Sequence, residues 1–113
     1  MSFFASLFGA TAQQNDAITI LEKEEFTAAI NKDSVQLVDV RTPQEYKAGF
    51  IKNAINIDFF NQSNFQKAFE QFDKEKPLYL YCRSGNRSQK AAQKLVDMGF
   101  KDIYDLRGGY LAW

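Results

Sequence analysis

The sequence predicts one α/β domain built on a parallel sheet of about five strands, with helices on both faces. Two observations lead to this class. Short apolar segments alternate with segments of helical periodicity along the chain, and most of the apolar segments do not alternate with polar residues. Strands buried on both faces have this continuous apolar character, and a strand–helix alternation is typical of a parallel sheet covered by helices.

The first strand and the first helix are expected near the N-terminus, and a buried strand follows them. Residues 18–20 form a short run of β-forming residues. In 22–31, Phe26 and Ile30 lie four positions apart, which places them on one face of a helix. The apolar run 35–40 is β-branched at three positions and has polar neighbours, so we expect a strand buried in the sheet.

A short capped helix and a small strand are expected next. Thr42 can serve as the N-cap, Pro43 suits the first helical position, and Glu45 completes a capping box. Gly49 suits the left-handed position that ends such a helix. Residues 54–57 are a candidate for a small strand.

The second half of the chain is expected to add two strands and two helices. A helix is predicted for 64–72, where three phenylalanines fall at positions i, i+4 and i+7, and strands are predicted for 78–81 and 103–106. Between these strands, 88–98 is helical by pattern and Gly99 can end it. The last four residues are expected to begin a further helix. The inner face of the 88–98 helix should hold Ala91, Ala92, Leu95 and Met98.

Composition excludes several classes of protein. The chain has 113 residues, of which 45% are hydrophobic, as expected of one globular domain. Basic and acidic residues number 14 each, whereas a nucleic-acid binder should carry a basic excess. No stretch approaches the roughly 20 apolar residues of a membrane span. We expect no nucleic-acid partner and no membrane span, and a monomeric or weakly dimeric protein.

Residues 1–15 are expected to be a flexible or leader segment, with the folded domain at 16–113. The apolar part of this segment is short, and its "ATAQ" loosely resembles a small-residue cleavage site. The basic region that normally opens a secretory signal is missing. A cytoplasmic location is therefore expected, with export as the alternative.

Cys82 is the only cysteine, and the chain contains no histidine. A single cysteine excludes an intrachain disulfide, and the lack of a Cys or His cluster argues against a zinc site. We expect no metal and no cofactor. Cysteine–histidine and serine–histidine nucleophile pairs are impossible within the chain. Whatever activates Cys82 must come from charge, backbone dipoles or an outside partner.

Cys82 follows the predicted strand 78–81 and precedes a helix, which places it at the carboxyl edge of the sheet, where ligands of such sheets bind. Free N–H groups and the dipole at a helix start favour a thiolate or another anion on the sulfur. The alternative is a small buried apolar cysteine, which the polar flanking residues disfavour. The candidate anion-binding residues are Arg83, Ser84, Gly85, Asn86, Arg87 and Ser88.

The spacing after Cys82 distinguishes two reactions. Cys-loop phosphatases and some arsenate reductases have five residues between the cysteine and an arginine that holds a tetrahedral oxyanion. Here four residues separate Cys82 from Arg87, and the position that a phosphatase would need is Ser88. The smaller loop suits a bound sulfur atom better than a phosphate.

Three segments then resemble the motifs of the single-domain rhodaneses, a sulfurtransferase family. They are "LVDVRTPQEYKAGFIKNAINI", "YLYCRSGNRSQKAA" and "GFKDIYDLRGGYLAW". They occur in the family's order, and the resemblance covers roughly residues 18–113. It implies a rhodanese-like sheet in the 16–113 domain.

The resemblance also implies an activity of the thiosulfate sulfurtransferase type. Cys82 would take a sulfane sulfur from thiosulfate or a persulfide donor, hold it as a persulfide, and pass it to cyanide, a thiol or a protein. Backbone N–H groups of residues 83–88 would cradle the persulfide. Arg83 and Arg87 would attract the anionic donor. The sequence does not identify the cellular donor or acceptor.

Two further positions match the family, and two depart from it. Asp39 and Arg41 match its D-x-R segment and are expected to brace the Cys82 loop; alternatively, Arg41 caps a helix or pairs with Glu45. Phe50 stands where the family usually has a histidine, and Asn53 where it often has a glycine. We expect the first change to alter packing or pH response without abolishing transfer.

Other readings of the function stay open. One is a sulfur-relay or partner-binding module, for which Phe59 and Phe60 could line an acceptor pocket at the site edge. Another is a Cys-loop phosphatase or arsenate reductase, which the loop length disfavours. The remaining phenylalanines of this region are expected to be core residues: Phe65, Phe69, Phe72 and Phe100.

Overall fold

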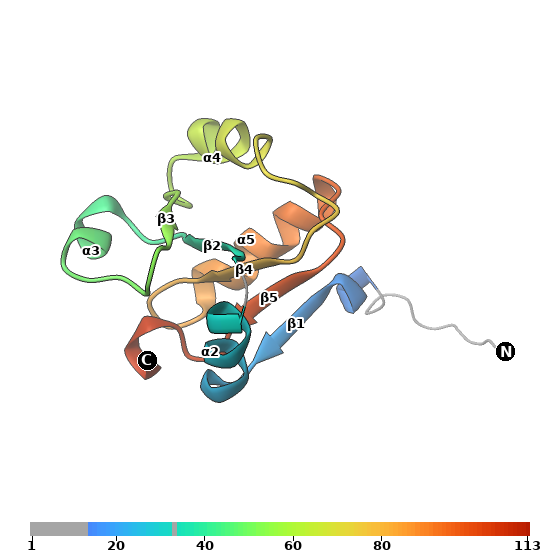
Figure 1. The fold of residues 1–113 in the computed structure, drawn as a ribbon. Helices are drawn as coiled ribbons and strands as arrows, with labels where there is room; N and C mark the ends of the chain where they lie inside the picture. Colours follow the sequence, from blue (N-terminus) through green and yellow to red (C-terminus); the bar gives the residue numbers. More distant parts are fainter. Residues whose placement is uncertain (1–13, 33) are drawn as a thin grey trace, which may run out of the picture.

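The computed structural model describes residues 14–32 and 34–113, and it confirms the predicted α/β class. Five strands form one sheet in the order β1-β5-β4-β2-β3, and every neighbouring pair is parallel (Figure 1). Residues 1–13 of the expected leader lie outside the described residues. The strands are β1 (Ile18–Leu21), β2 (Gln36–Asp39), β3 (Ile55–Asn56), β4 (Leu78–Tyr81) and β5 (Ile103–Leu106).

Helices connect the strands and cover both faces of the sheet. They are η2 (Gln14–Ala17), α2 (Lys23–Lys32), α3 (Pro43–Lys47), α4 (Gln62–Phe69), α5 (Asn86–Asp97) and η3 (Tyr110–Ala112). In Figure 1, α2 and the C-terminus lie below the sheet and α4 lies above it. Among the residues described, no helix is long and apolar enough to span a bilayer.

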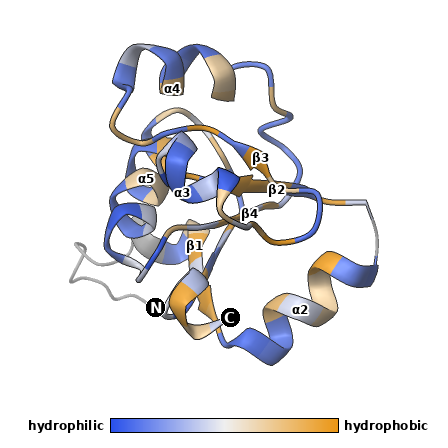
Figure 2. Cartoon of the chain, turned by 90° about the vertical axis from the view of Figure 1, so that its left-hand side faces the viewer, coloured by the Kyte–Doolittle hydropathy of each residue, from blue (hydrophilic) through white to orange (hydrophobic). Residues whose placement is uncertain are grey.

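Each face of the sheet has its own hydrophobic core. On one face, α4 and α5 pack their apolar side chains against β4, β2 and β5, with Phe65, Phe69 and Leu95 fully buried. On the other face, Phe26 and Ile30 of α2 pack against the sheet, which confirms the predicted helix face. Figure 2 shows hydrophobic residues within β2 and β3, and most of α4 as hydrophilic.

The predicted core phenylalanines and inner helix face are mostly confirmed. Phe65, Phe69 and Phe100 are buried, as are Ala91, Ala92 and Leu95 on α5. Phe72 and Met98 are only partly buried and pack against the same core. Both lie beyond the last residue of a helix, Phe69 in α4 and Asp97 in α5.

Several helix ends differ from the prediction for local reasons. α4 begins two residues early because the Asn61 side chain accepts a hydrogen bond from Asn64 N and caps it. α5 also begins two residues early, directly after Gly85, whose φ is 108°. The final segment is a single 3₁₀ turn rather than the start of an α-helix.

The capped helix α3 forms as predicted at its start and differently at its end. Thr42 is the N-cap, and both hydrogen bonds of its capping box with Glu45 are present. Ala48 is the C-cap and Gly49 follows it, the predicted position, but its positive φ of 152° lies outside the left-handed helical range. A Cβ on Gly49 would lie 2.7 Å from the Tyr110 hydroxyl oxygen, so the positive φ and this contact both favour glycine here.

The strand register brings three chain segments to one edge of the sheet. β4 is the central strand, with Tyr81 opposite Asp39 on β2 and Leu80 opposite Asp105 on β5. Because all strands are parallel, their carboxyl ends meet at the same edge. Cys82 follows β4 at that edge, as the sequence predicts.

Candidate active site

The sulfur of Cys82 lies at the base of a tight turn between β4 and α5. The Gly85 backbone N–H donates a hydrogen bond to Cys82 Sγ, with an N–S distance of 3.0 Å. Gly85 reaches this position with a positive φ, which glycine adopts without a Cβ penalty. Cys82 is only 1% exposed, so the surrounding protein covers it almost completely.

The N-terminus of α5 faces this turn. The first intrahelical hydrogen bond runs from Gln89 N to Gly85 O. The N–H groups of Asn86, Arg87 and Ser88 therefore precede the internal bonds of the helix and are available to an anion. The helix dipole adds a partial positive charge at this end. Together with the Gly85 N–H, this end of α5 can stabilise a negative charge on Cys82 or on an atom bonded to it.

Ser88 closes the inner side of the turn. Its side chain is fully buried. The Cys82 thiol donates to Ser88 Oγ over 3.4 Å, and Ser88 Oγ donates to Gly85 O over 3.2 Å. The hydroxyl can rotate and donate to the sulfur once the thiol has lost its proton.

Arg87 is held in place by Glu45, a partner that the sequence did not identify for it. Arg87 Nη1 lies 2.8 Å from Glu45 Oε1, and Nη2 lies 3.0 Å from Oε2. This pairing lowers the pKa of Glu45 to about 2 and raises the pKa of Arg87. The charge of Cys82 also raises the pKa of Arg87, so Arg87 lies within electrostatic reach of the sulfur. The Phe60 ring stacks under the guanidinium, 5.3 Å from its carbon.

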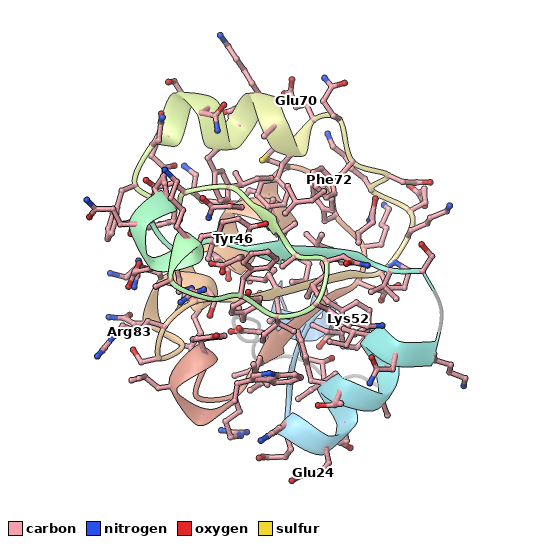
Figure 3. All side chains as sticks on the ribbon, turned by 60° about the vertical axis from the view of Figure 1, so that its left-hand side comes forward. Glu24, Tyr46, Lys52, Glu70, Phe72 and Arg83 are labelled. Atoms are coloured by element: carbon pink, nitrogen blue, oxygen red, sulfur yellow. The ribbon has the colours of Figure 1, made fainter. Side chains whose placement is uncertain are left out.

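The outer side of the loop is open to solvent. Arg83, Ser84 and Asn86 are exposed, and Figure 3 shows Arg83 reaching outward at the edge of the molecule. The backbone of Arg83 is fixed, because its carbonyl oxygen accepts a hydrogen bond from Leu111 N over 2.9 Å. Arg83 thus presents an exposed cation next to the loop, on a backbone held by this hydrogen bond.

Asp39 and Arg41 form a buried ion pair beneath the loop. Arg41 Nη2 lies 2.6 Å from Asp39 Oδ2, and the side chains are 4% and 0% exposed. The guanidinium also donates to Gly49 O and stacks on Tyr110, 4.3 Å from the ring centre. Tyr110 N in turn donates to Cys82 O over 2.8 Å. The pair therefore reaches the Cys82 loop through Tyr110.

The alternative pairing of Arg41 with Glu45 is wrong. Both carboxylate oxygens of Asp39 accept hydrogen bonds from Arg41, and Glu45 pairs with Arg87 instead. Phe50, in the position where a histidine was expected from the resemblance, stacks on Tyr46 at 4.1 Å and remains 43% exposed.

Gly109 is a supporting residue that sequence reasoning missed. A Cβ on it would lie 2.6 Å from Cys82 O and from Arg83 O. The chain after β5 therefore lies against the start of the Cys82 loop only because this residue has no side chain. The adjacent glycines of "LRGGY" are the local sequence signal for such a close approach.

Other features of the surface do not bear on this turn. A pocket of about 790 Å³, lined in part by Lys32, Val35 and Pro77, lies at the opposite edge of the sheet and shares no residue with the loop. Within 14–32 and 34–113, no three Asp, Glu, Cys or His side chains group closely enough to hold a metal ion.

Comparison with known proteins relates this geometry to a family. Residues 22–113 match the rhodanese-like domain family. The chain is 38% identical over 84 residues to the thiosulfate sulfurtransferase GlpE of Coxiella burnetii, which covers 74% of this chain and 76% of that protein. It is 37% identical over 95 residues to a tRNA uridine(34) hydroxylase of Cytophaga hutchinsonii, covering 82% of this chain but only 30% of that protein.

A solved structure has the same fold. The rhodanese-like domain protein of Staphylococcus aureus superposes with a TM-score of 0.72 at 30% identity, over 83% of this chain and 89% of that one. The parallel sheet and its covering helices are thus those of a known domain family.

Proposed function

Because the chain belongs to the rhodanese-like domain family, we propose that it is a sulfurtransferase that carries a sulfane sulfur on Cys82. The donor is thiosulfate or a persulfide, and the acceptor is cyanide, a thiol or a protein. The observation that carries this proposal is the turn around Cys82, in which the sulfur receives the Gly85 N–H and faces the start of α5. The similarity to a thiosulfate sulfurtransferase supports it.

The reaction with thiosulfate has two balanced steps. The Cys82 thiolate attacks the outer sulfur of the donor, the sulfur–sulfur bond of the donor breaks, and its electron pair leaves with sulfite. Cys82 then holds a persulfide anion. An acceptor such as cyanide attacks the terminal sulfur, which leaves as thiocyanate and regenerates the thiolate.

The charges around the turn suit this sequence. The negative charge stays near Cys82 in the thiolate and in the persulfide, so the same N–H groups stabilise both. Arg83 is exposed and is placed to attract an anionic donor. Arg87 is fixed by Glu45, so it contributes a positive potential of defined position rather than a mobile clamp.

The decisive assay is turnover of thiosulfate and cyanide to thiocyanate. The protein should form thiocyanate at a rate proportional to its concentration, and Cys82→Ser should abolish the reaction while leaving the circular dichroism spectrum unchanged. Cys82→Ser turning over at the rate of the wild type would exclude Cys82 as the sulfur carrier.

A sulfur relay to a protein acceptor is a second candidate, and two exposed hydrophobic residues favour it. Phe60 is 65% exposed and Leu111 is 62% exposed. Phe60 contacts Arg87, and Leu111 is hydrogen-bonded to Arg83 O, so both flank the loop. If the acceptor is a protein, Phe60→Ser and Leu111→Ser should leave thiocyanate formation unchanged and slow sulfur transfer to that acceptor. Equal loss in both assays would count against a docking role.

A further inference from the structure

A buried carboxyl group lies behind the Cys82 turn, on the neighbouring strand. Asp105 is the third residue of β5 and pairs with Leu80, two residues before Cys82. Its side chain is 1% exposed. Among residues 14–32 and 34–113, nothing forms a hydrogen bond with its Oδ1 atom. Natural proteins rarely leave a buried carboxyl oxygen without a partner, so the group calls for an explanation.

Ser88 connects this carboxyl group to the sulfur. Asp105 and Ile103 lie on the face of β5 that α5 covers, and Ser88 is in the first turn of α5. Ser88 is fully buried on this face, where its hydroxyl accepts the Cys82 thiol hydrogen bond over 3.4 Å and donates to Gly85 O over 3.2 Å. The side chain of Ser88 also lowers the pKa of Asp105. A single hydroxyl therefore lies between the thiol and the unpartnered carboxyl group.

The other charged groups of the neighbouring elements do not face Asp105. β1 contains no titratable residue, and Tyr79 and Tyr81 of β4 belong to the core on the opposite face of the sheet. α2 packs on that opposite face as well. This leaves Cys82 as the titratable group on the same side. The charged residues of α5 and of the end of β5 are partly or fully exposed: Arg87, Lys90, Lys94, Asp97 and Arg107.

We propose that Asp105 stores the proton that Cys82 gives up, with the Ser88 hydroxyl as the relay. The inference rests on the proposed sulfurtransferase function and adds a positioning residue to it. It also supplies the proton acceptor that the absence of histidine leaves unassigned.

The proton transfer balances without any outside reactant. At rest the thiol donates to Ser88 Oγ, and the Ser88 hydroxyl donates to Gly85 O. For the transfer, the hydroxyl rotates from Gly85 O to the ionised Asp105. When the sulfur–hydrogen bond breaks, its proton passes to Ser88 Oγ and the original Ser88 proton passes to Asp105. The negative charge moves from a carboxylate whose Oδ1 has no hydrogen-bond partner to a sulfur that accepts the Gly85 N–H. Neutral Asp105 then donates to Ser88, and Ser88 donates to the thiolate or to the persulfide sulfur.

Burial gives Asp105 the raised pKa that a group must have to accept a proton from Cys82. Desolvation raises the pKa of Asp105 to about 7, although the Ser88 hydroxyl lowers it slightly. Near neutral pH the group can therefore both accept and return a proton. Above that range, the ionised Asp105 places a second negative charge behind the sulfur and holds Ser88 turned away from it, so thiolate formation is opposed.

The test is the rate at which iodoacetamide alkylates Cys82 as a function of pH. Asp105→Asn preserves the shape of the side chain and imitates the protonated carboxyl group, because its amide donates permanently to Ser88. The alkylation rate of this variant should follow a single ionisation as the pH rises. The midpoint should lie about one pH unit below the midpoint of the wild type, in which Cys82 and Asp105 form a coupled pair that shares a proton. Asp97→Asn, an exposed carboxylate of α5, should match the wild type.

Two outcomes would overturn the inference. One is a profile of Asp105→Asn that coincides with the wild type while circular dichroism shows both folded. The other is an equal shift of Asp105→Asn when Ser88 is already replaced by alanine, because the relay would then be unnecessary. Sulfur loading is measured separately. Shifted alkylation without any persulfide from thiosulfate would sink the proposed function and leave the Asp105 assignment standing.

Discussion

Glu45 and Arg87 form a two-point ion pair that joins the capping box of α3 to the first turn of α5. The two residues are 42 positions apart in the chain. The Glu45 carboxylate therefore makes two kinds of contact. It accepts a hydrogen bond from Thr42 N at the start of α3, and it holds Arg87 of the cysteine loop in place.

Removing this pair should cost stability in a pH-dependent manner. Arg87 lowers the pKa of Glu45 from 4.5 to about 2, so the stabilisation is fully present above about pH 4.5 and is lost as the pH falls toward 2. Glu45→Gln should lower the free energy of unfolding at pH 7 by roughly 1–3 kcal/mol, after allowance for solvent screening. Urea titrations at pH 7 and pH 3 check this. A deficit of the same size at both pH values would contradict the assigned cause.

Asp39→Asn should be more damaging, because it leaves the Arg41 charge buried without its partner. We expect a loss of about 3–5 kcal/mol in the free energy of unfolding, measured by urea titration at neutral pH. Arg107→Gln is the matched control: its ion pair with Glu22 is 59% exposed on both sides, and its removal should cost less than about 1 kcal/mol. Similar losses in the two variants would refute the view that burial distinguishes the pairs.

Gly109→Ala should impair the site more than the fold. Its Cβ would push on the Cys82 and Arg83 carbonyl groups at 2.6 Å, and a shift of the cysteine turn should slow sulfur loading by about 10- to 100-fold. The measurement is the initial rate of thiocyanate formation.

Gly99→Ala provides the control for this effect. Gly99 also has a positive φ, of 105°, but a Cβ there would meet only the Lys74 side chain at 3.7 Å. The Gly99→Ala variant should lose stability through backbone strain. Its folded form should keep the wild-type rate of thiocyanate formation. A rate loss in Gly99→Ala equal to that in Gly109→Ala would mean that general destabilisation, not the displaced turn, is responsible.

Asp105→Asn should stabilise the protein at alkaline pH. Burial raises the pKa of Asp105 from 3.8 to about 7, so the wild type loses stability as the pH rises from about 4 to about 7. The variant lacks that loss and should exceed the wild type by roughly 2–4 kcal/mol at pH 8, with little difference at pH 4. Thermal or urea unfolding at the two pH values measures it. A variant less stable than the wild type at pH 8 would show that the ionised carboxylate has a partner.

The sequence predicted the strands, the helix order and the edge position of Cys82 because these depend on local patterns. An apolar strand, a polar turn and a helical period are readable within a few residues, and parallel strands bring the turn to the carboxyl edge. The Thr42 capping box is local in the same sense.

The contacts that shape the site join distant segments, and the sequence did not reveal them. Glu45 could have paired with Arg41, four residues away, and only the folded chain shows that it pairs with Arg87. Gly109 and Asp105 support the site from segments that lie far from Cys82 in the chain, and Asp105 carries no local signature of its role. The buried carboxyl group in particular looks in the sequence like an ordinary polar residue near a loop.

The central claim is that Cys82 itself carries the transferred sulfur, and the intact mass of the protein tests it most directly. After incubation with thiosulfate and removal of the donor, the account predicts a gain of one sulfur atom, located on the Cys82 peptide, lost on addition of cyanide and absent from Cys82→Ser. An unchanged mass in the folded wild-type protein, or a cyanide-labile sulfur that persists in Cys82→Ser, would contradict it.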